Sequence, residues 1–223
     1  MLMEKNSHLF VYVIARDFGF APNPFFGICT LATCKPGIRK GANVGDWVMG
    51  VAGRELGKSI HKKCILLMKV TEKIGFQEYW NDTRFQIKKP CRNGSALKMI
   101  GDNIYHRNNE GEWIQEDSHH SLENGMENEG NLNRDTGQSD QVLISNLFFY
   151  FGNQAIPVNL ELINYKPGLG FKKISLDEGL GARGIIETVC SENERLCNTI
   201  VSDPCQFADA HKRVDQRARK ITG

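Results

Sequence analysis

The chain has 223 residues, of which 40% are hydrophobic and 24% are charged, and its formal net charge is +2. This is the composition of an ordinary globular protein, and the length suits one large domain or a domain with an appendage. No apolar run approaches the roughly 18 residues that cross a membrane, and residues 1–8 lack the apolar stretch of a signal peptide. Seven cysteines are an odd number in a chain of this size. They favour reduced thiols, so we expect a cytoplasmic protein. Because no apolar run could span a membrane, we expect no membrane partner.

Charge is distributed unevenly along the chain. Residues 35–98 contain fourteen Lys and Arg against five Asp and Glu, whereas residues 99–140 contain two against ten. Affinity for a polyanion comes chiefly from Lys and Arg. The basic block therefore indicates a surface that faces phosphate groups, and the alternative is that the two segments pack against each other.

The first half of the chain predicts strands around an irregular segment. Residues 9–16 (LFVYVIAR) are rich in β-branched and aromatic residues and predict a strand. Residues 17–41 mix Gly, Pro and aromatics, which indicates an irregular segment packed against the core. Two further strands are predicted at residues 43–52 and 62–74. A short helix is expected from Phe76, where aromatic residues recur at helical spacing.

The second half predicts one polar segment, two strands and a helical end. Residues 101–140 are polar and nearly free of aliphatic side chains, a composition expected for a functional or disordered stretch. Residues 142–151 predict a strong strand and residues 158–163 a weaker one. An amphipathic helix with a basic face is predicted from Pro204 onward, with Asp203 as its N-cap.

Several long motifs carry a family resemblance. They are DFGFAPNPFFGICTLATCKPGIRKGANVGDWVMG at 17–50, GDNIYH at 101–106, WIQEDSHHS at 113–121, NLNRDTG at 131–137 and VLIS at 142–145. In this order they resemble the nucleotide-modification-associated domain family, second type, over about residues 9–165. The resemblance implies a link to bacterial and phage systems that make, recognise or process modified bases. It implies a nucleotide or nucleic acid as partner, DNA rather than RNA, and it specifies no reaction.

A second resemblance concerns the fold. The stretch GDWVMGVAG at 45–53, followed by KCILLMKVTEKIGFQEYW at 63–80, is similar to barrels of the PUA, ASCH and EVE type. We therefore expect an α+β fold: a compact, partly closed barrel of mostly antiparallel strands with flanking helices. We expect residues 1–165 to form this domain and residues 166–223 to be a helical extension packed on it. Fold alone does not fix function.

Two motifs in the polar segment supply candidate catalytic residues. Asp102 and His106 are four residues apart, a spacing that brings side chains to the same side in a helix or in a strand. Such a pair could act as a general acid and base, and the alternative is a structural hydrogen bond. The adjacent His119 and His120 would point to opposite faces of a strand, so one would serve a given pocket. We predict Asp102, His106 and His119 as catalytic residues.

Further residues are predicted to contact a base or its phosphates. Aromatic rings near basic residues could stack on a base, and a carboxylate could read the edge of an extruded base. A sealed apolar cluster and a surface ion pair are the respective alternatives. The predicted contacts are Asp17, Phe20, Asn23, Arg39, Asp82, Lys88, Asn103, Tyr105, Gln115, Asp117, Ser118, His120 and Asp135.

The sequence assigns no cofactor and no metal. Walker A and Rossmann glycine motifs are missing from the sequence, which disfavours ATP- and NAD-dependent enzymes. Cys29 and Cys34 have the outermost zinc-ligand spacing, but no second cysteine pair follows. A set of His106, His119 and Asp117 was the other metal site considered.

These observations support three hypotheses. The first is a protein that binds a nucleotide or base in a polar His/Asp pocket and could act on it by acid–base chemistry. The second is a reader that recognises modified DNA or RNA without turnover. The third is a defence-associated interaction protein whose basic C-terminal end contacts a partner. The sequence leaves catalysis and oligomeric state open.

Overall fold

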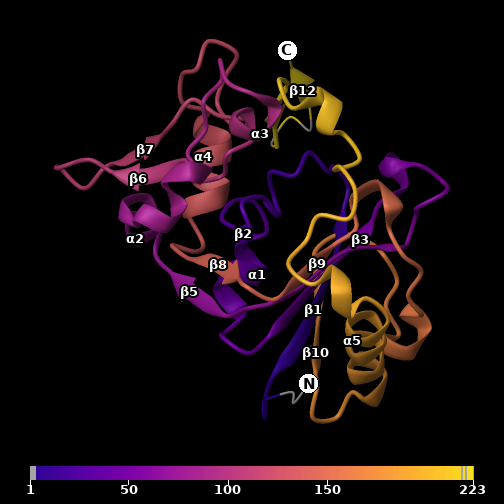
Figure 1. The fold of residues 1–223 in the computed structure, drawn as a ribbon. Helices are drawn as coiled ribbons and strands as arrows, with labels where there is room; N and C mark the ends of the chain where they lie inside the picture. The colour runs from indigo at the N-terminus through magenta and orange to yellow at the C-terminus, as the bar shows by residue number, and fades with distance from the viewer. Residues whose placement is uncertain (1–3, 217, 219, 223) are drawn as a thin grey trace.

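The computed structural model describes residues 4–216, 218 and 220–222, and it has an α+β fold built on a central sheet (Figure 1). The strand order in this five-stranded sheet is β10-β1-β3-β4-β9. β1 and β3 are parallel, and the other neighbours are antiparallel. The strands are β1 (His8–Ile14), β3 (Trp47–Ala52), β4 (Cys64–Lys69), β9 (Phe148–Tyr150) and β10 (Phe171–Ser175).

A second, three-stranded sheet stacks on the first. Its antiparallel order is β2-β8-β5, and its strands are β2 (Cys29–Leu31), β5 (Glu72–Ile74) and β8 (Val142–Ser145). Two hairpins complete the β-structure: β6 (Tyr105–Arg107) with β7 (Trp113–Gln115), and β11 (Arg213–Asp215) with β12 (Lys220–Thr222). The sheets do not close, because β9 and β10 end the main sheet without pairing with each other. The predicted barrel is therefore wrong.

Short helices connect these strands, and one longer helix covers the main sheet. The α-helices are α1 (Pro36–Gly41), α2 (Phe76–Asn81), α3 (Ala96–Met99), α4 (Glu129–Thr136) and α5 (Leu180–Glu192). The 3-10 helices are η1 (Arg54–Leu56), η2 (Thr83–Lys88), η3 (Gly152–Gln154), η4 (Leu160–Ile163), η5 (Glu194–Leu196) and η6 (Phe207–Asp209). None of the helices in the described part of the chain is long and apolar enough to cross a membrane.

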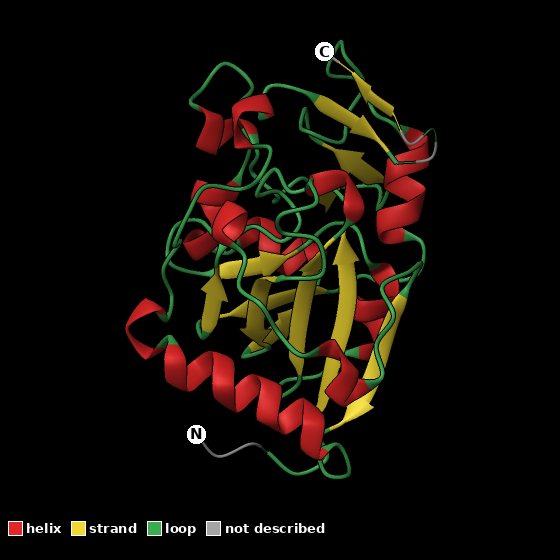
Figure 2. Ribbon diagram, turned by 90° about the vertical axis from the view of Figure 1, so that its right-hand side faces the viewer, coloured by secondary structure: helices red, strands yellow, loops and turns green. Residues whose placement is uncertain are grey.

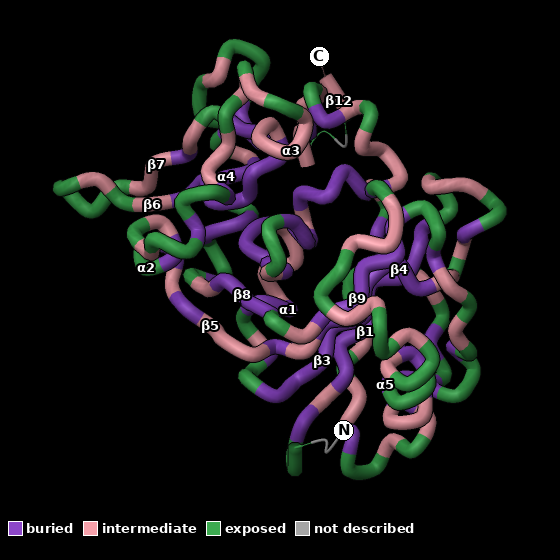
Figure 3. Tube along the Cα trace, viewed as in Figure 1, coloured by how far each residue is buried: buried purple, intermediate pink, exposed green. Residues whose placement is uncertain are grey.

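Both faces of β1, β3, β4 and β9 in the main sheet are buried, and this explains the apolar runs in these strands (Figure 3). On one face, Leu9 and Val11 pack with Ile186 of α5, which lies across the strands in Figure 2. On the other face, Phe10 and Tyr12 pack beneath the second sheet and α1. Strands buried on both sides read as continuous hydrophobic runs rather than as an alternating pattern.

Several element predictions need correction. Residues 62–74 divide into β4 and β5, and residues 142–151 divide into β8 and β9, each pair contributing to both sheets. Residues 158–163 contain the 3-10 helix η4 instead of a strand. The polar stretch 101–140 is ordered and contains β6, β7 and α4.

The predicted C-terminal helix is also wrong. Beyond Pro204 the described residues form η6 and the β11–β12 hairpin, whereas Arg217 of the expected basic face lies outside them. Hydrogen bonds to the body of the protein fix this conformation. The backbone N–H of Val214, for example, donates to the carbonyl of His119 at 2.8 Å. Such tertiary contacts outweigh helix propensity.

Candidate active site

Cys34 occupies a strained turn between β2 and α1. Its φ is +56° and that of Lys35 is +40°, both in the left-handed region. Such a conformation costs a residue other than glycine about 1–3 kcal/mol. Two hydrogen bonds hold the turn: the backbone N–H of Cys34 donates to Asp135 Oδ1 at 2.8 Å, and Arg39 Nε donates to the Cys34 carbonyl at 2.8 Å. These hydrogen bonds offset the cost of the turn that carries this half-buried thiol.

The thiol lies at the end of a hydrogen-bonded chain. His120 follows β7 and Asp135 belongs to α4, and both side chains are buried. His120 Nδ1 lies 2.9 Å from Asp135 Oδ2, and His120 Nε2 lies 3.8 Å from Cys34 Sγ. A carboxylate can only accept a hydrogen bond, so Nδ1 carries a proton and Nε2 faces the sulfur. This is the order of nucleophile, base and orienting acid found in a catalytic triad.

The charges of His120 and Asp135 stabilise each other. Burial alone would lower the pKa of His120, but the charges of Cys34 and Asp135 raise it to about 10. Burial opposes ionisation of Asp135, yet the charge and hydrogen bond of His120 hold the pKa of this carboxyl below its usual range. His120 is therefore an imidazolium at neutral pH. A cation beside a cysteine stabilises its thiolate, the nucleophilic form.

We expected Tyr105, Gln115 and Arg39 to contact the ligand, but their hydrogen bonds instead hold Asp135 in place. Tyr105 Oη donates to Asp135 Oδ2 at 2.9 Å, and Gln115 Nε2 donates to Tyr105 Oη at 3.1 Å. Arg39 is fully buried, and its guanidinium donates to the carbonyls of Asp135 and, at 2.7 Å, of Gln141. With its N–H groups bound to backbone carbonyls, Arg39 is a structural residue and not the phosphate contact we expected.

Gln216 covers the thiol. It belongs to residues 205–216, which we call the C-terminal segment. Its Nε2 lies 3.7 Å from Cys34 Sγ and 3.4 Å from His120 Nε2, while its Oε1 accepts a hydrogen bond from Arg134 at 3.1 Å. Asn131 anchors this segment, because its side chain accepts from the Gln216 N–H at 2.9 Å and donates to the Val214 carbonyl at 2.7 Å. A carboxamide N–H group therefore points at the reactive pair.

His119 also anchors the C-terminal segment. Its Nδ1 donates to the Lys212 carbonyl at 2.6 Å, and its ring packs between Phe18 and Phe20. Burial, followed by the charge of His120, lowers the pKa of His119 well below its usual value. His119 is thus a neutral donor to a backbone carbonyl, whereas Phe20 also contacts the ring of His120, with centroids 4.7 Å apart.

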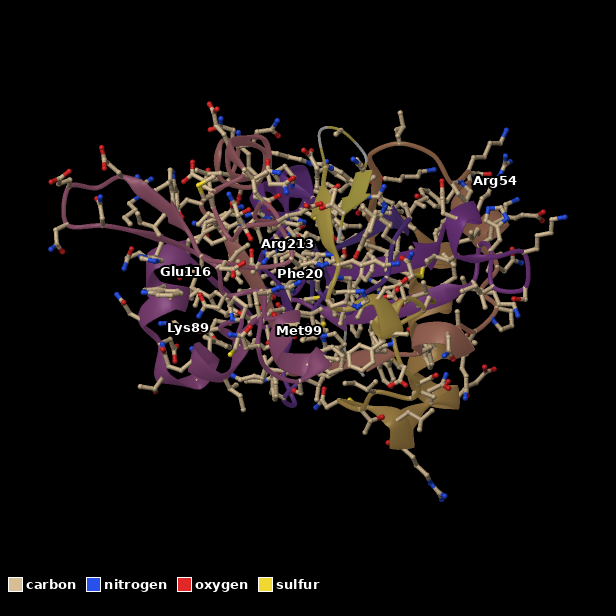
Figure 4. The ribbon with its side chains drawn as sticks, turned by 90° about the horizontal axis from the view of Figure 1, so that it is seen from above. Phe20, Arg54, Lys89, Met99, Glu116 and Arg213 are labelled. Carbon is tan, nitrogen blue, oxygen red and sulfur yellow. The ribbon has the colours of Figure 1, made fainter. Side chains whose placement is uncertain are left out.

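Asp117, Ser118 and Asp17 bind the same C-terminal segment. Arg213 donates to Asp117 Oδ1 at 2.5 Å and to the Ser118 carbonyl at 2.6 Å. Asp17 accepts from Tyr150 Oη at 2.5 Å and from the Cys205 N–H at 3.1 Å. In Figure 4, which looks down on the molecule, Arg213 and Phe20 are seen close together near the middle of the view. These residues attach the segment over the site.

Asp102 belongs to a buried network away from His106. It accepts hydrogen bonds from Thr30 Oγ1 at 2.6 Å and from Tyr79 Oη at 2.8 Å. Burial raises the pKa of Asp102 and the charge of Lys88 lowers it. The expected contact between Asp102 and His106 is not formed.

Two other predicted binding residues, Asn23 and Asn103, complete this network. Lys88 Nζ donates to Asn23 Oδ1 at 2.8 Å, and Asn103 Nδ2 donates to the Tyr79 carbonyl at 3.0 Å. Lys88, Asn23 and Asn103 are all buried. The network joins the segment after β1 to α2 and η2.

His106 and Asp82 are partly buried, with side-chain exposures of 15% and 19%. His106 Nε2 is 2.8 Å from Glu116 Oε1, and its ring stacks on Trp80 with centroids 4.0 Å apart. Asp82 accepts from the Arg84 side chain at 2.6 Å. In Figure 4, Glu116 lies beside Lys89 and away from Phe20. His106 is thus remote from the thiol chain.

The donor set at Cys34 fits a hydrogen-bonded triad better than a metal centre. Cys34, His120 and Asp135 each offer an atom within 4.8 Å of the others, the spacing of a possible metal site. However, Asp135 Oδ1 already accepts from the Cys34 N–H, and Oδ2 accepts from Tyr105. Cys29, the zinc partner considered for Cys34, instead lies with its sulfur 3.9 Å from Met68 Sδ.

The sequence motifs contained His120 and Asp135, but they did not point to the thiol that these residues face. His120 and Asp135 were expected at the ligand, whereas Cys34 was considered only as a metal ligand and Gln216 was missed. The one local signal is a cysteine just before the Pro-Gly start of α1.

Comparison with known proteins gives a family but no characterised relative. The family model described as Nucleotide modification associated domain 2 matches residues 6–210. No curated protein and no solved structure matches the chain. The matched range includes Cys34, His120 and Asp135 and ends before Gln216.

Proposed function

Since the chain belongs to the Nucleotide modification associated domain 2 family, we propose that it modifies a nucleotide, free or within a strand, by nucleophilic catalysis at Cys34. The observation that carries this proposal is the chain from Cys34 Sγ through His120 to Asp135, with distances of 3.8 and 2.9 Å. The acid–base chemistry expected from the sequence remains part of the proposal. We propose that His120 and Asp135 carry it out, instead of Asp102 and His106.

The arrangement suits acyl transfer or hydrolysis at an acyl group on the nucleotide. Cys34 Sγ attacks the acyl carbon, an S–C bond forms, and the carbonyl electron pair moves to oxygen. The adjacent Gln216 N–H is placed to donate to that oxygen. When the intermediate collapses, the bond to the leaving amine or alcohol breaks, and His120 Nε2 gives it the proton. Water assisted by His120 then hydrolyses the thioester.

The first test is the reactivity of the thiol towards iodoacetamide at pH 7, followed peptide by peptide by mass spectrometry. Cys91 is exposed and lies outside the site, so it serves as an internal control. We expect Cys34 to react faster than Cys91 although it is less exposed, because only the thiolate reacts. In His120→Asn, its rate should fall by roughly tenfold, since a free thiol is a few per cent ionised at pH 7. The rate of Cys91 should not change.

The second part of the test looks for turnover. Wild-type protein and Cys34→Ser are incubated with acylated nucleosides, nucleotides and short DNA strands, and both protein mass and products are measured. A thioester on the wild type alone would support the proposal. If Cys34 reacts more slowly than Cys91 and is indifferent to His120→Asn, the nucleophile assignment is wrong. Salt-sensitive binding without any product would favour the reader hypothesis.

A further inference from the structure

A large cavity adjoins the thiol site. Its volume is about 1200 Å³, above the roughly 300–1,000 Å³ of most small-molecule sites. Its lining includes the basic residues Lys35, Arg54, His61, Lys62, Arg134 and Lys166. We propose that this cavity binds the phosphate groups of the nucleotide substrate, and that it holds several phosphates of one strand. The inference rests on the proposed function at Cys34.

The cations of the cavity lack carboxylate partners. Within the described residues, Lys35, Arg54, Lys62, Arg134 and Lys166 form no salt bridge, although Glu55 and Glu161 also line the cavity. Elsewhere on the surface, Lys69 pairs with Glu4, and Arg84 pairs with Glu72. Concentrated unpaired positive charge in a concave site attracts anions strongly. The cavity is thus complementary in charge to a polyphosphate chain.

The cavity and the thiol share a wall. Lys35 follows Cys34 in the strained turn, and Arg134 precedes Asp135 on α4. Arg134 donates to Gln216 Oε1, and Gln216 Nε2 lies against Cys34 Sγ. A phosphate held by Lys35 and Arg134 would therefore place the attached nucleoside beside the thiol.

The outer end of the cavity favours a strand over a single nucleotide. Figure 4 shows Arg54 at the edge of the molecule, far from the central Phe20. Leu169 and Phe171 add exposed apolar surface to the lining, with 96% and 42% exposure. An aromatic face beside basic residues is the usual platform for single strands, since bases stack on the ring while cations hold the backbone.

The test measures binding of a fluorescent 12-nucleotide single-stranded DNA by anisotropy at several salt concentrations. The variant is Arg54→Glu with Lys62→Glu, two exposed cavity residues remote from the triad. The control is Lys5→Glu with Lys40→Glu, which changes the net charge equally outside the cavity. We expect the cavity variant to weaken binding at least tenfold and to reduce the salt slope by roughly 1.4, and the control to have a much smaller effect.

A competition arm separates the two sources of phosphate. If unlabelled DNA competes and ATP does not, the ligand is a strand. If ATP competes and its affinity also falls in the cavity variant, the same site binds free nucleotides. No binding of either ligand, or equal losses in variant and control, would overturn the inference. Iodoacetamide reactivity of Cys34 should be unchanged in the cavity variant, so failure here is distinguishable from failure of the proposed nucleophile.

Discussion

At the scale of single residues, the candidate site contains buried groups that shift each other's pKa, as His120 and Asp135 do. His120 and Asp135 were within motifs that stood out for their polar side chains, and both reach the site. The spacing of Asp102 and His106 did not bring them together, because positions four apart share a side only within one regular element. The structure begins β6 at Tyr105, which leaves Asp102 outside it. Residues far apart in the sequence, such as Cys34 and Asp135, meet only through the fold.

The raised pKa of His120 predicts a pH-dependent stability. Its folded value of about 10 exceeds the ordinary value near 6.5. The stabilisation is therefore fully present below about pH 6.5 and is lost as the pH rises through about 10. Cys34→Ser removes one of the two charges that raise this pKa, so its alkaline loss of stability should end at a lower pH and be smaller in total. Thermal unfolding between pH 6 and 10, with Cys91→Ser as control, measures this. Identical profiles for both variants would contradict it.

At the scale of elements, the C-terminal segment forms a strand at residues 213–215 where its amphipathic pattern predicted a helix. Val214 alternates with polar neighbours, a pattern compatible with a strand as well as a helix. The choice is made by partners that the local sequence does not contain: His119 for the backbone around residues 212–214, and Asp117 for Arg213. By contrast, β1 and α2 were predictable: β1 has an unbroken apolar run that is buried on both faces, and α2 has aromatic residues at helical spacing.

Arg213 should control how often the segment opens over the thiol. Arg213→Ala removes its bonds to Asp117 and Ser118, a loss of roughly 1 kcal/mol after allowance for solvent screening, or about fivefold in the opening equilibrium. Alkylation of Cys34 and hydrogen exchange at residues 211–216 should both accelerate. Lys212→Ala is the matched control, since its side chain pairs with Asp209 instead. Equal acceleration in the two variants would remove Arg213 from this role.

At the scale of the whole molecule, the buried polar network around Asp102 and the candidate site at Cys34 are two separate sets of hydrogen-bonded residues. The Asp102–Lys88 network joins the segment after β1 to α2 and η2, whereas the triad joins β2, β7 and α4. Apolar runs predicted several of the strands, and the α+β fold was an expectation from the resemblance to PUA, ASCH and EVE barrels. They did not predict the parallel pairing of β1 with β3 or two separate sheets, because pairing depends on connections between distant segments.

Asp102→Asn should lower stability without altering the thiol. The change weakens the buried hydrogen bonds that Asp102 accepts from Thr30 Oγ1 and Tyr79 Oη, and leaving such a buried group unsatisfied costs roughly 1–3 kcal/mol. Urea unfolding should reveal this loss, while Cys34 in the folded variant should keep its iodoacetamide reactivity. His106→Ala, outside this network, should likewise leave the reactivity of Cys34 unchanged. Loss of Cys34 reactivity in folded Asp102→Asn would return Asp102 to the catalytic machinery.

The placement of Gln216 has a consequence for biosynthesis. A ribosome releases the chain from its N-terminus, so Cys34, His120 and Asp135 all leave the exit tunnel before the segment that covers them. A nascent chain that has paired β1, β3 and β4 with β9 could already hold the reactive thiol while still tethered. During that interval the sulfur would be open to oxidants and electrophiles in the cell. Docking of Gln216 over the thiol would then end this exposure.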